Sequence, residues 1–208
     1  MLGKLRDRLQ LYLVTDDQED LYQRTEAAIR GGVTCVQLRM KKASSRQFLE
    51  TGKRFKELCQ KYQIPLVIND RADVALLAQA DMLHIGQNDL SIQEARQIVG
   101  LDMPIGVSVH SVEEAVQAKQ DGASYLGVGS MFPTSSKDDA TIVSIKTLSS
   151  IREAVSLPIV LIGGINQKTL PALAPYIPDG VAIISGILSA PCPKSMASYF
   201  KKELEKLV

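Results

Sequence analysis

Three side chains that could bind an anion follow one short apolar stretch of the sequence. Gln37, Arg39 and Lys41 stand at every second position after residues 33–36. Because residues two apart share one face of a strand, an amide, a guanidinium and an ammonium group would project together there. Two neighbouring cations repel each other unless solvent or an anion lies between them. The spacing indicates either a strand end with solvated charges or an anion site.

The hydrophobic pattern around this stretch predicts eight short strands, each followed by a helix or helical turn. The strands are expected at residues 11–15, 33–41, 65–68, 81–86, 104–108, 124–129, 159–162 and 180–184. Helices are expected at residues 21–30, 44–62, 72–79 (a short one), 91–99, from 111, 144–155 and 196–207. Most of the strands are apolar on both faces, as is typical of buried parallel strands.

Strict alternation of strand and helix predicts a parallel sheet. Eight units fit a closed (β/α)8 barrel, and 208 residues lie near the lower size limit of that fold. An open doubly wound sheet is the alternative, but no Gly-rich dinucleotide motif follows the first strand. We therefore expect an α/β protein with a single (β/α)8 TIM-barrel domain over residues 1–208.

The composition excludes several classes of function. A net charge of +1, from 24 basic and 23 acidic residues, indicates neither nucleic-acid nor membrane-surface binding. Cys35, Cys59 and Cys192 lack CxxC spacing, so neither disulfides nor a zinc site is indicated. Neither a signal sequence nor an apolar segment of transmembrane length is present, which predicts a cytoplasmic protein. The oligomeric state stays open, a homo-oligomer included.

Carboxylates that could hold a metal follow two neighbouring predicted strands. In a barrel the active site lies at the carboxyl ends of the strands, and Asp70 and Asp89 both stand there. Such hard oxygen ligands suit Mg²⁺, which usually takes one or two carboxylates together with water and phosphate oxygens. Either residue could instead serve in a turn, and Asp70 could pair with Arg71.

Two groups of residues at the same end of the barrel suggest two phosphate sites. Arg39, Lys41 and Lys137 would bind a diphosphate together with Mg²⁺. Gly163-Gly164 and the stretch Ile184-Ser185-Gly186 end the last two strands, where barrels often bind a phosphate through backbone N–H groups. Two sites imply two phosphorylated ligands, one of which loses diphosphate as a stabilised leaving group. Neither a Ser-His-Asp order nor a Cys-His pair suggests covalent catalysis.

Short motifs spread over nearly the whole chain carry a resemblance to a known family. They are Tyr12-Leu13-Val14-Thr15-Asp16, Gly31-Gly32-Val33-Thr34, Gln37-Leu38-Arg39-Met40-Lys41, Ile68-Asn69-Asp70-Arg71, His84-Ile85-Gly86-Gln87-Asn88-Asp89, Gly106-Val107-Ser108, Gly127-Val128-Gly129, Phe132-Pro133-Thr134 and Ile162-Gly163-Gly164-Ile165. In this order they resemble the thiamine-phosphate synthase family. The resemblance implies a (β/α)8 barrel that joins hydroxymethylpyrimidine diphosphate to thiazole phosphate and releases diphosphate.

The resemblance also implies a role for each matching residue. It places Mg²⁺ on Asp70 and Asp89, and it makes Arg39, Lys41, Ser108 and Lys137 the expected catalytic residues. The pyrimidine diphosphate is expected to contact Gln37, Leu38, Arg39, Met40, Lys41, Asn69, Ser108 and Lys137. The thiazole phosphate is expected to contact Thr134, Ser135, Ser136, a glycine of Gly163-Gly164, Ile184 and Ser185.

The sequence departs from the family's usual pattern in a few places. The family usually has Glu or Asp where Met40 stands, and strand parity predicts that this side chain faces away from the barrel mouth. The loop usually reads Thr-x-Thr-Lys, whereas this chain has Thr134-Ser135-Ser136-Lys137. The glycine often found after that loop is replaced near Val143-Ser144.

Two alternative functions fit part of the pattern. The related thiazole tautomerase shares the barrel and a Ser-x-His motif, here Ser108-Val109-His110, which would supply an imidazole for proton transfer. A non-catalytic barrel that senses phosphorylated ligands is the second. Asp89 and the set at 37–41 favour the synthase, because a tautomerase has no diphosphate to bind. His84 is interpreted as a residue of the barrel packing.

Overall fold

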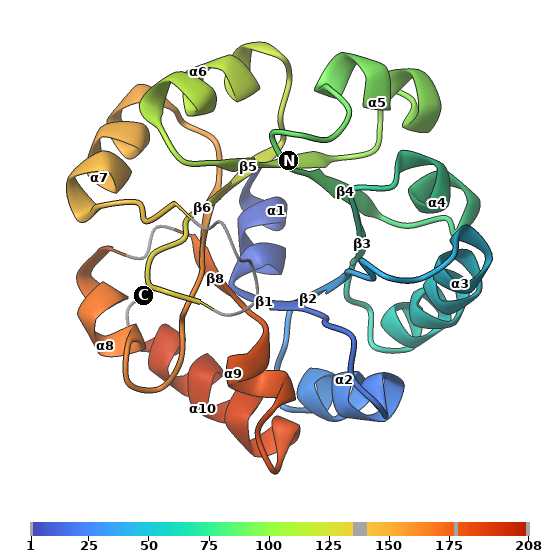
Figure 1. The fold of residues 1–208 in the computed structure, drawn as a ribbon. Helices are drawn as coiled ribbons and strands as arrows, with labels where there is room; N and C mark the ends of the chain where they lie inside the picture. The colour runs from blue at the N-terminus through green and yellow to red at the C-terminus, as the bar shows by residue number, and fades with distance from the viewer. Residues whose placement is uncertain (1, 135–140, 177–178, 207–208) are drawn as a thin grey trace.

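Eight parallel strands close into a barrel in the computed structural model, which describes residues 2–134, 141–176 and 179–206. The strands pair in chain order, and the last pairs with the first (Figure 1). They are β1 (Leu11–Val14), β2 (Cys35–Leu38), β3 (Leu66–Asn69), β4 (Met82–Ile85), β5 (Ile105–Val109), β6 (Tyr125–Val128), β7 (Ile159–Ile162) and β8 (Gly180–Ile183). The predicted (β/α)8 barrel is confirmed.

β2 is shorter than the sequence predicts. It ends at Leu38, so Arg39 and Lys41 lie in the loop that follows rather than in the strand. The physical reason is that β1 ends at Val14, and the last backbone bond between the two segments runs from the N–H of Thr15 to the carbonyl of Gln37. Beyond that bond the hydroxyl of Thr15 takes the place of strand backbone, accepting from the N–H of Arg39 at 2.9 Å and donating to the carbonyl of Arg39 at 3.3 Å.

Helices surround the barrel (Figure 1). They are α2 (Leu21–Arg30), α3 (Ser45–Lys61), α4 (Ala72–Leu77), α5 (Ile92–Val99), α6 (Val112–Gln120), α7 (Ile145–Ala154), α8 (Leu170–Leu173), the 3₁₀ turn η1 (Ala174–Tyr176), α9 (Ser185–Leu188) and α10 (Pro193–Glu205). Serine side chains cap several of these helices: the hydroxyls of Ser44, Ser91 and Ser111 each accept a backbone N–H from the first turn. In the described part of the chain, no helix has both the length and the apolar character that a membrane span requires.

A further helix, α1 (Leu2–Leu9), precedes the first strand and was not expected from the sequence. Leu5 and Leu9 pack against the residues inside the barrel. The carbonyl of Leu9 also lies against Gly180, at the start of β8, so α1 covers the amino-terminal end of the barrel (Figure 1). The opposite, carboxyl end is the one that a ligand can enter.

The core has two layers, because successive strand residues point alternately inward and outward. Outward residues and the helices form the larger layer, which includes the buried Cys59. The inner layer holds Tyr12, Val14, Cys35, Val67, Met82, Tyr125, Val160 and Ala182. The inward positions nearest the carboxyl ends of β2 to β5 are polar, and they form the floor of the site described next.

Candidate active site

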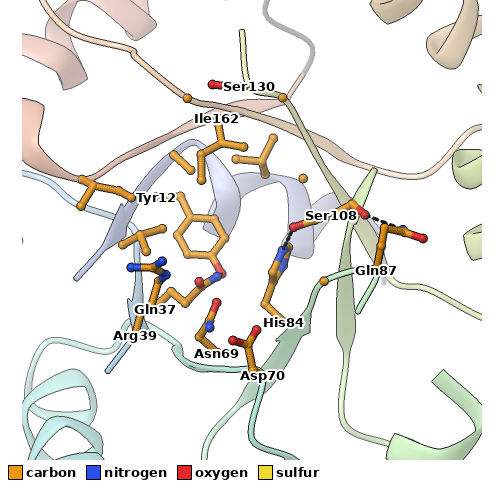
Figure 2. Close-up of a pocket in the computed structure, with 18 of the residues that line it drawn as sticks. Tyr12, Gln37, Arg39, Asn69, Asp70, His84, Gln87, Ser108, Ser130 and Ile162 are labelled. Atoms are coloured by element: carbon orange, nitrogen blue, oxygen red, sulfur yellow. Dashed lines mark hydrogen bonds between the residues drawn. The ribbon is translucent and has the colours of Figure 1, made fainter. Parts of the chain in front are cut away.

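A cavity of about 250 Å³ opens at the carboxyl ends of the strands. Its polar wall comes from β2 to β5, which contribute Gln37, Asn69, His84 and Ser108 (Figure 2). The wall across the barrel comes from β1, β7, β8 and the residue after β8, and it is apolar: Val14, Val160, Ile162, Ala182 and Ile184. A flat ring with polar edges fits between two such walls, because the apolar side packs on its face while the polar side receives its edge.

The three side chains that begin the predicted anion site line this cavity together. Gln37, Arg39 and Lys41 all reach it, although only Gln37 belongs to a strand. Lys41 Nζ lies 3.2 Å from Asp70 Oδ2. The cations therefore face the same mouth as the predicted metal ligands, and the lysine has a carboxylate as its counter-ion.

Leu38 and Met40, which alternate with these three residues, point away from the cavity. Leu38 is fully buried in the outer core layer, and Met40 packs against the same layer. The orientation of Met40 is the one that strand parity predicts. Only the backbone groups of these two residues could therefore meet a ligand in the cavity.

The predicted metal ligands lie close to each other. Asp70 follows β3, and Asp89 stands in the turn after β4, where its Oδ2 accepts the N–H of Gly86 at 2.7 Å. Burial raises the pKa of Asp89, and its hydrogen bond with the Asp70 carboxyl raises that pKa further. A divalent cation bound beside Asp89 would favour its ionised form, because an opposite charge stabilises a carboxylate.

The donor set fits Mg²⁺ better than a transition metal. Across the residues that the structure describes, no cluster of three or more His, Cys, Asp or Glu side chains could hold an ion. Two carboxylates, with water and phosphate oxygens for the other positions, are the usual ligands of Mg²⁺ at phosphate sites. Arg71, the alternative partner of Asp70, instead forms an ion pair of 2.6 Å with Asp73.

A chain of hydrogen bonds crosses the floor of the cavity. Gln37 Nε2 donates to the hydroxyl of Tyr12 at 2.7 Å, and the hydroxyls of Tyr12 and Tyr125 lie 2.9 Å apart. Tyr125 contacts His84 Nδ1 at 3.1 Å, and His84 Nε2 contacts Ser108 Oγ at 3.0 Å. Burial lowers the pKa of His84 to about 4, so its imidazole is neutral near pH 7.

Sequence reasoning missed this chain. It interpreted His84 as packing only, whereas the residue also lines the cavity and contacts Ser108 (Figure 2). Strand parity could have found it, because Tyr12, His84 and Tyr125 occupy inward positions of their strands. Polar atoms buried inside a barrel need hydrogen-bond partners, and the side chains at these inward positions are the nearest partners for one another.

A second cavity adjoins the first and shares Thr134, Ile162, Gly163, Ala182 and Ile184 with it. It is further lined by Gly164, Ser185 and Gly186, so the two glycine-containing stretches predicted to bind a phosphate lie together. Gly163 has φ +99°, and a Cβ there would lie 2.0 Å from Ser130 Oγ. Only glycine fits this position, which brings backbone close to the ligand space.

The remaining predicted residues divide into two groups. His110 lines the first cavity, with its Nδ1 3.2 Å from Glu114 Oε2. Thr134 lines both cavities. Ser135, Ser136 and Lys137 lie outside the described residues, so the structure gives no position for them.

Comparisons with known proteins agree with the motifs. A family model described as thiamine monophosphate synthase matches residues 11–187. The thiamine-phosphate synthase of Clostridium acetobutylicum is 49% identical over 184 residues, which cover 86% of this chain and 87% of that protein. That of Clostridioides difficile is 47% identical over 206 residues, covering 97% and 95%.

A solved structure shows the same relationship. Thiamine phosphate pyrophosphorylase from Pyrococcus furiosus superposes with a TM-score of 0.90 at 36% identity, covering 98% of this chain and 99% of that one. These relatives support neither the tautomerase nor the non-catalytic barrel. The chain therefore belongs to the thiamine monophosphate synthase family of enzymes.

Proposed function

We propose that this enzyme joins hydroxymethylpyrimidine diphosphate to thiazole phosphate, producing thiamine phosphate and diphosphate. One observation carries the proposal: a cavity with cations and paired carboxylates adjoins a second cavity lined by glycine backbone, and the two share Gly163 and Ile184. Two phosphorylated ligands bound there would have their reactive ends at the shared boundary. This arrangement lowers the entropic cost of bringing them together.

The diphosphate would occupy the mouth of the first cavity. Arg39 and Lys41 line it, and their charges complement the anion. Mg²⁺ bound by Asp70 and Asp89 would neutralise the diphosphate oxygens and stabilise them as a leaving group. Lys137 is proposed as a third cation on the basis of its place in the motif.

The pyrimidine ring would lie deeper in the same cavity. Its face would pack on the apolar wall that includes Val160 and Ile162, and its edge would meet Gln37, Asn69 and Ser108. The ring carries an amino group that donates hydrogen bonds and ring nitrogens that accept them. The wall of amide and hydroxyl groups matches both.

The thiazole phosphate would bind in the second cavity. The loop of Gly163 and Gly164 and the first residue of α9, Ser185, offer backbone N–H and hydroxyl groups to a phosphate. Thr134 lines the boundary between the cavities and could contact either ligand.

The chemistry that follows needs few protein groups. The bond between the exocyclic CH₂ and the diphosphate oxygen breaks, and diphosphate leaves with the electron pair. The aminopyrimidine donates electron density to the CH₂ cation, which the lone pair of the thiazole nitrogen then captures. No proton is removed at that nitrogen, so the residues act by orienting both rings and stabilising the departing charge.

The test is to mix both substrates with the enzyme and Mg²⁺ and to measure diphosphate and thiamine phosphate together. We expect equal amounts of both products, and no reaction after EDTA until Mg²⁺ is restored. Omitting thiazole phosphate separates transfer from hydrolysis of the diphosphate. Binding of both substrates without product would contradict the proposal and favour a sensor.

A further inference from the structure

The hydrogen-bond chain under the cavity has a single direction. Gln37 Nε2 is a donor, so the Tyr12 hydroxyl accepts from it and has its own proton left for Tyr125. Tyr125 in turn can donate only to His84 Nδ1. A neutral imidazole that accepts at Nδ1 carries its proton on Nε2, which then donates to Ser108 Oγ.

Burial makes this direction strict. Tyr125 is 0% exposed and Tyr12 is 2% exposed, so water cannot replace a missing partner for either hydroxyl. A buried polar hydrogen without an acceptor costs more free energy than an ordinary hydrogen bond gains. Each proton in the chain is therefore committed to the next acceptor.

The two ends of the chain have opposite polarity. Among the described residues, Gln37 Oε1 accepts no hydrogen bond, so the amide presents an acceptor to a ligand. Ser108 Oγ accepts from His84 and keeps its own proton to donate. Inverting the Gln37 amide would reverse the direction of every hydrogen bond between Gln37 and Ser108. The Gln37 amide and the Ser108 hydroxyl can therefore exchange their donor and acceptor roles only together.

The strands are built around the rings of this chain. A Cβ on Gly106 would lie 2.1 Å from Cζ of Tyr125, and a Cβ on Gly127 would lie 3.1 Å from Cε1 of His84. β5 and β6 therefore lack side chains at the inward positions that the two rings occupy. The rings cannot turn away into another space without moving the barrel wall.

We propose that Tyr12, Tyr125 and His84 are positioning residues that determine specificity: they hold Gln37 as an acceptor and Ser108 as a donor. The cavity then selects a ring with a hydrogen-bond donor toward Gln37 and an acceptor toward Ser108. This inference rests on the proposed function, because an aminopyrimidine offers both. An analogue with an oxo group in place of the amino group meets acceptor with acceptor and is rejected.

Histidine NMR of the ligand-free enzyme tests the direction of the chain without any substrate. The sequence has two histidines, so ¹⁵N-labelling gives two imidazole spectra. We expect His84 at pH 7.5 to be the tautomer with its proton on Nε2. In Tyr125→Phe, which keeps the ring and removes the hydroxyl, Nδ1 loses its donor, and the two tautomers should mix. A proton on Nδ1 in the wild type, or an unchanged tautomer in the variant, would overturn the proposal.

Substrate discrimination tests the consequence. The measured quantity is the ratio of binding constants of the aminopyrimidine diphosphate and its oxo analogue. In Tyr125→Phe the Gln37 amide can rotate, so we expect that ratio to fall about tenfold while KM for thiazole phosphate stays within about twofold. Tyr62→Phe is the matched control, because it removes a hydroxyl that is hydrogen-bonded to Glu26 outside the site.

Equal discrimination in wild type and Tyr125→Phe would overturn the proposal. A wild-type enzyme that makes no thiamine phosphate would count against the proposed function alone, because the tautomer is read in the absence of substrates. The two failures are therefore distinguishable.

Discussion

Lys41 Nζ lies 3.2 Å from Asp70 Oδ2, so a cation proposed to bind diphosphate is paired with a carboxylate proposed to bind the metal. Both side chains are accessible, and a mutual contact of this kind contributes little to stability. It keeps each charge balanced until ligands arrive. When a diphosphate and Mg²⁺ bind together, we expect the lysine to turn to the anion and the carboxylate to the metal.

Asp70→Asn should weaken the binding of Mg²⁺ at the proposed metal site. The amide has no charge for Mg²⁺ and leaves Lys41 without its counter-ion. We expect turnover to fall by about 100-fold or more, with a higher Mg²⁺ concentration needed for half-maximal rate. Diphosphate release measured against Mg²⁺ concentration checks this. Asp73→Asn is the control, since Asp73 pairs with Arg71 and should retain the wild-type curve.

Arg39→Ala should lower turnover without weakening thiazole phosphate binding. The side chain lines the first cavity but not the second. Removing a group that stabilises developing negative charge typically costs about 10²–10³ in kcat. Steady-state kinetics with each substrate varied in turn would measure it. Arg54→Ala is the control, because Arg54 stacks on Tyr22 away from the site. An unchanged rate in Arg39→Ala would reject the role of Arg39 at the diphosphate.

Acid should destabilise the fold through His84. Its pKa in the folded state is about 4, below the ordinary value of 6.5, so the unfolded chain takes up the proton first as the pH falls. The contribution of the neutral imidazole to the free energy of unfolding is complete above pH 6.5 and is lost as the pH falls to 4. The loss attributable to this residue is about 3 kcal/mol at most.

Urea unfolding in metal-free buffer at several pH values checks this loss. The free energy of unfolding should decline more steeply between pH 6.5 and pH 4 in wild type than in His84→Gln, which has no titrating group there. Parallel curves for the two proteins would show that the buried imidazole is not the group responsible.

Gly163→Ala should disrupt the second cavity. The methyl group would lie 2.0 Å from Ser130 Oγ, and the residue has φ +99°. Gly100→Ala is the matched control, because Gly100 has φ +79° with nothing within 4 Å of an added Cβ. Backbone strain alone costs about 1–3 kcal/mol, so the control should lose that amount and Gly163→Ala should lose more.

Denaturant unfolding of both variants measures the difference, and the KM for thiazole phosphate should rise in Gly163→Ala only. Equal losses of stability in Gly163→Ala and Gly100→Ala would contradict this expectation. They would mean that the Ser130 side chain moves aside and that its contact does not restrict residue 163 to glycine.

The order of helices and strands, and most of the polar residues at the carboxyl ends of the strands, were predictable from the sequence. Apolar strands such as β7 and serine caps such as Ser91 are local features, so periodicity and capping chemistry reveal them. The barrel follows because eight strand–helix units have few other ways to bury both faces of a parallel sheet. Asp70 and Asp89 could be expected near each other because they end neighbouring strands.

Other features depend on contacts between residues far apart in the chain. β2 stops at Leu38 because Thr15 bonds the backbone that follows, and α1 forms because Leu5 and Leu9 find the open end of the barrel. The residues around β2 and α1 in the sequence do not reveal these distant contacts.

The hydrogen-bond chain is the clearest case of what only tertiary structure decided. Motifs along the sequence determined which family the enzyme belongs to and which polar residues line the cavity. The direction of the protons from Gln37 to Ser108 depends on Tyr12, His84 and Tyr125 meeting inside the barrel. Buried donors and acceptors are satisfied through space, so their polarity is set by packing and not by spacing along the chain.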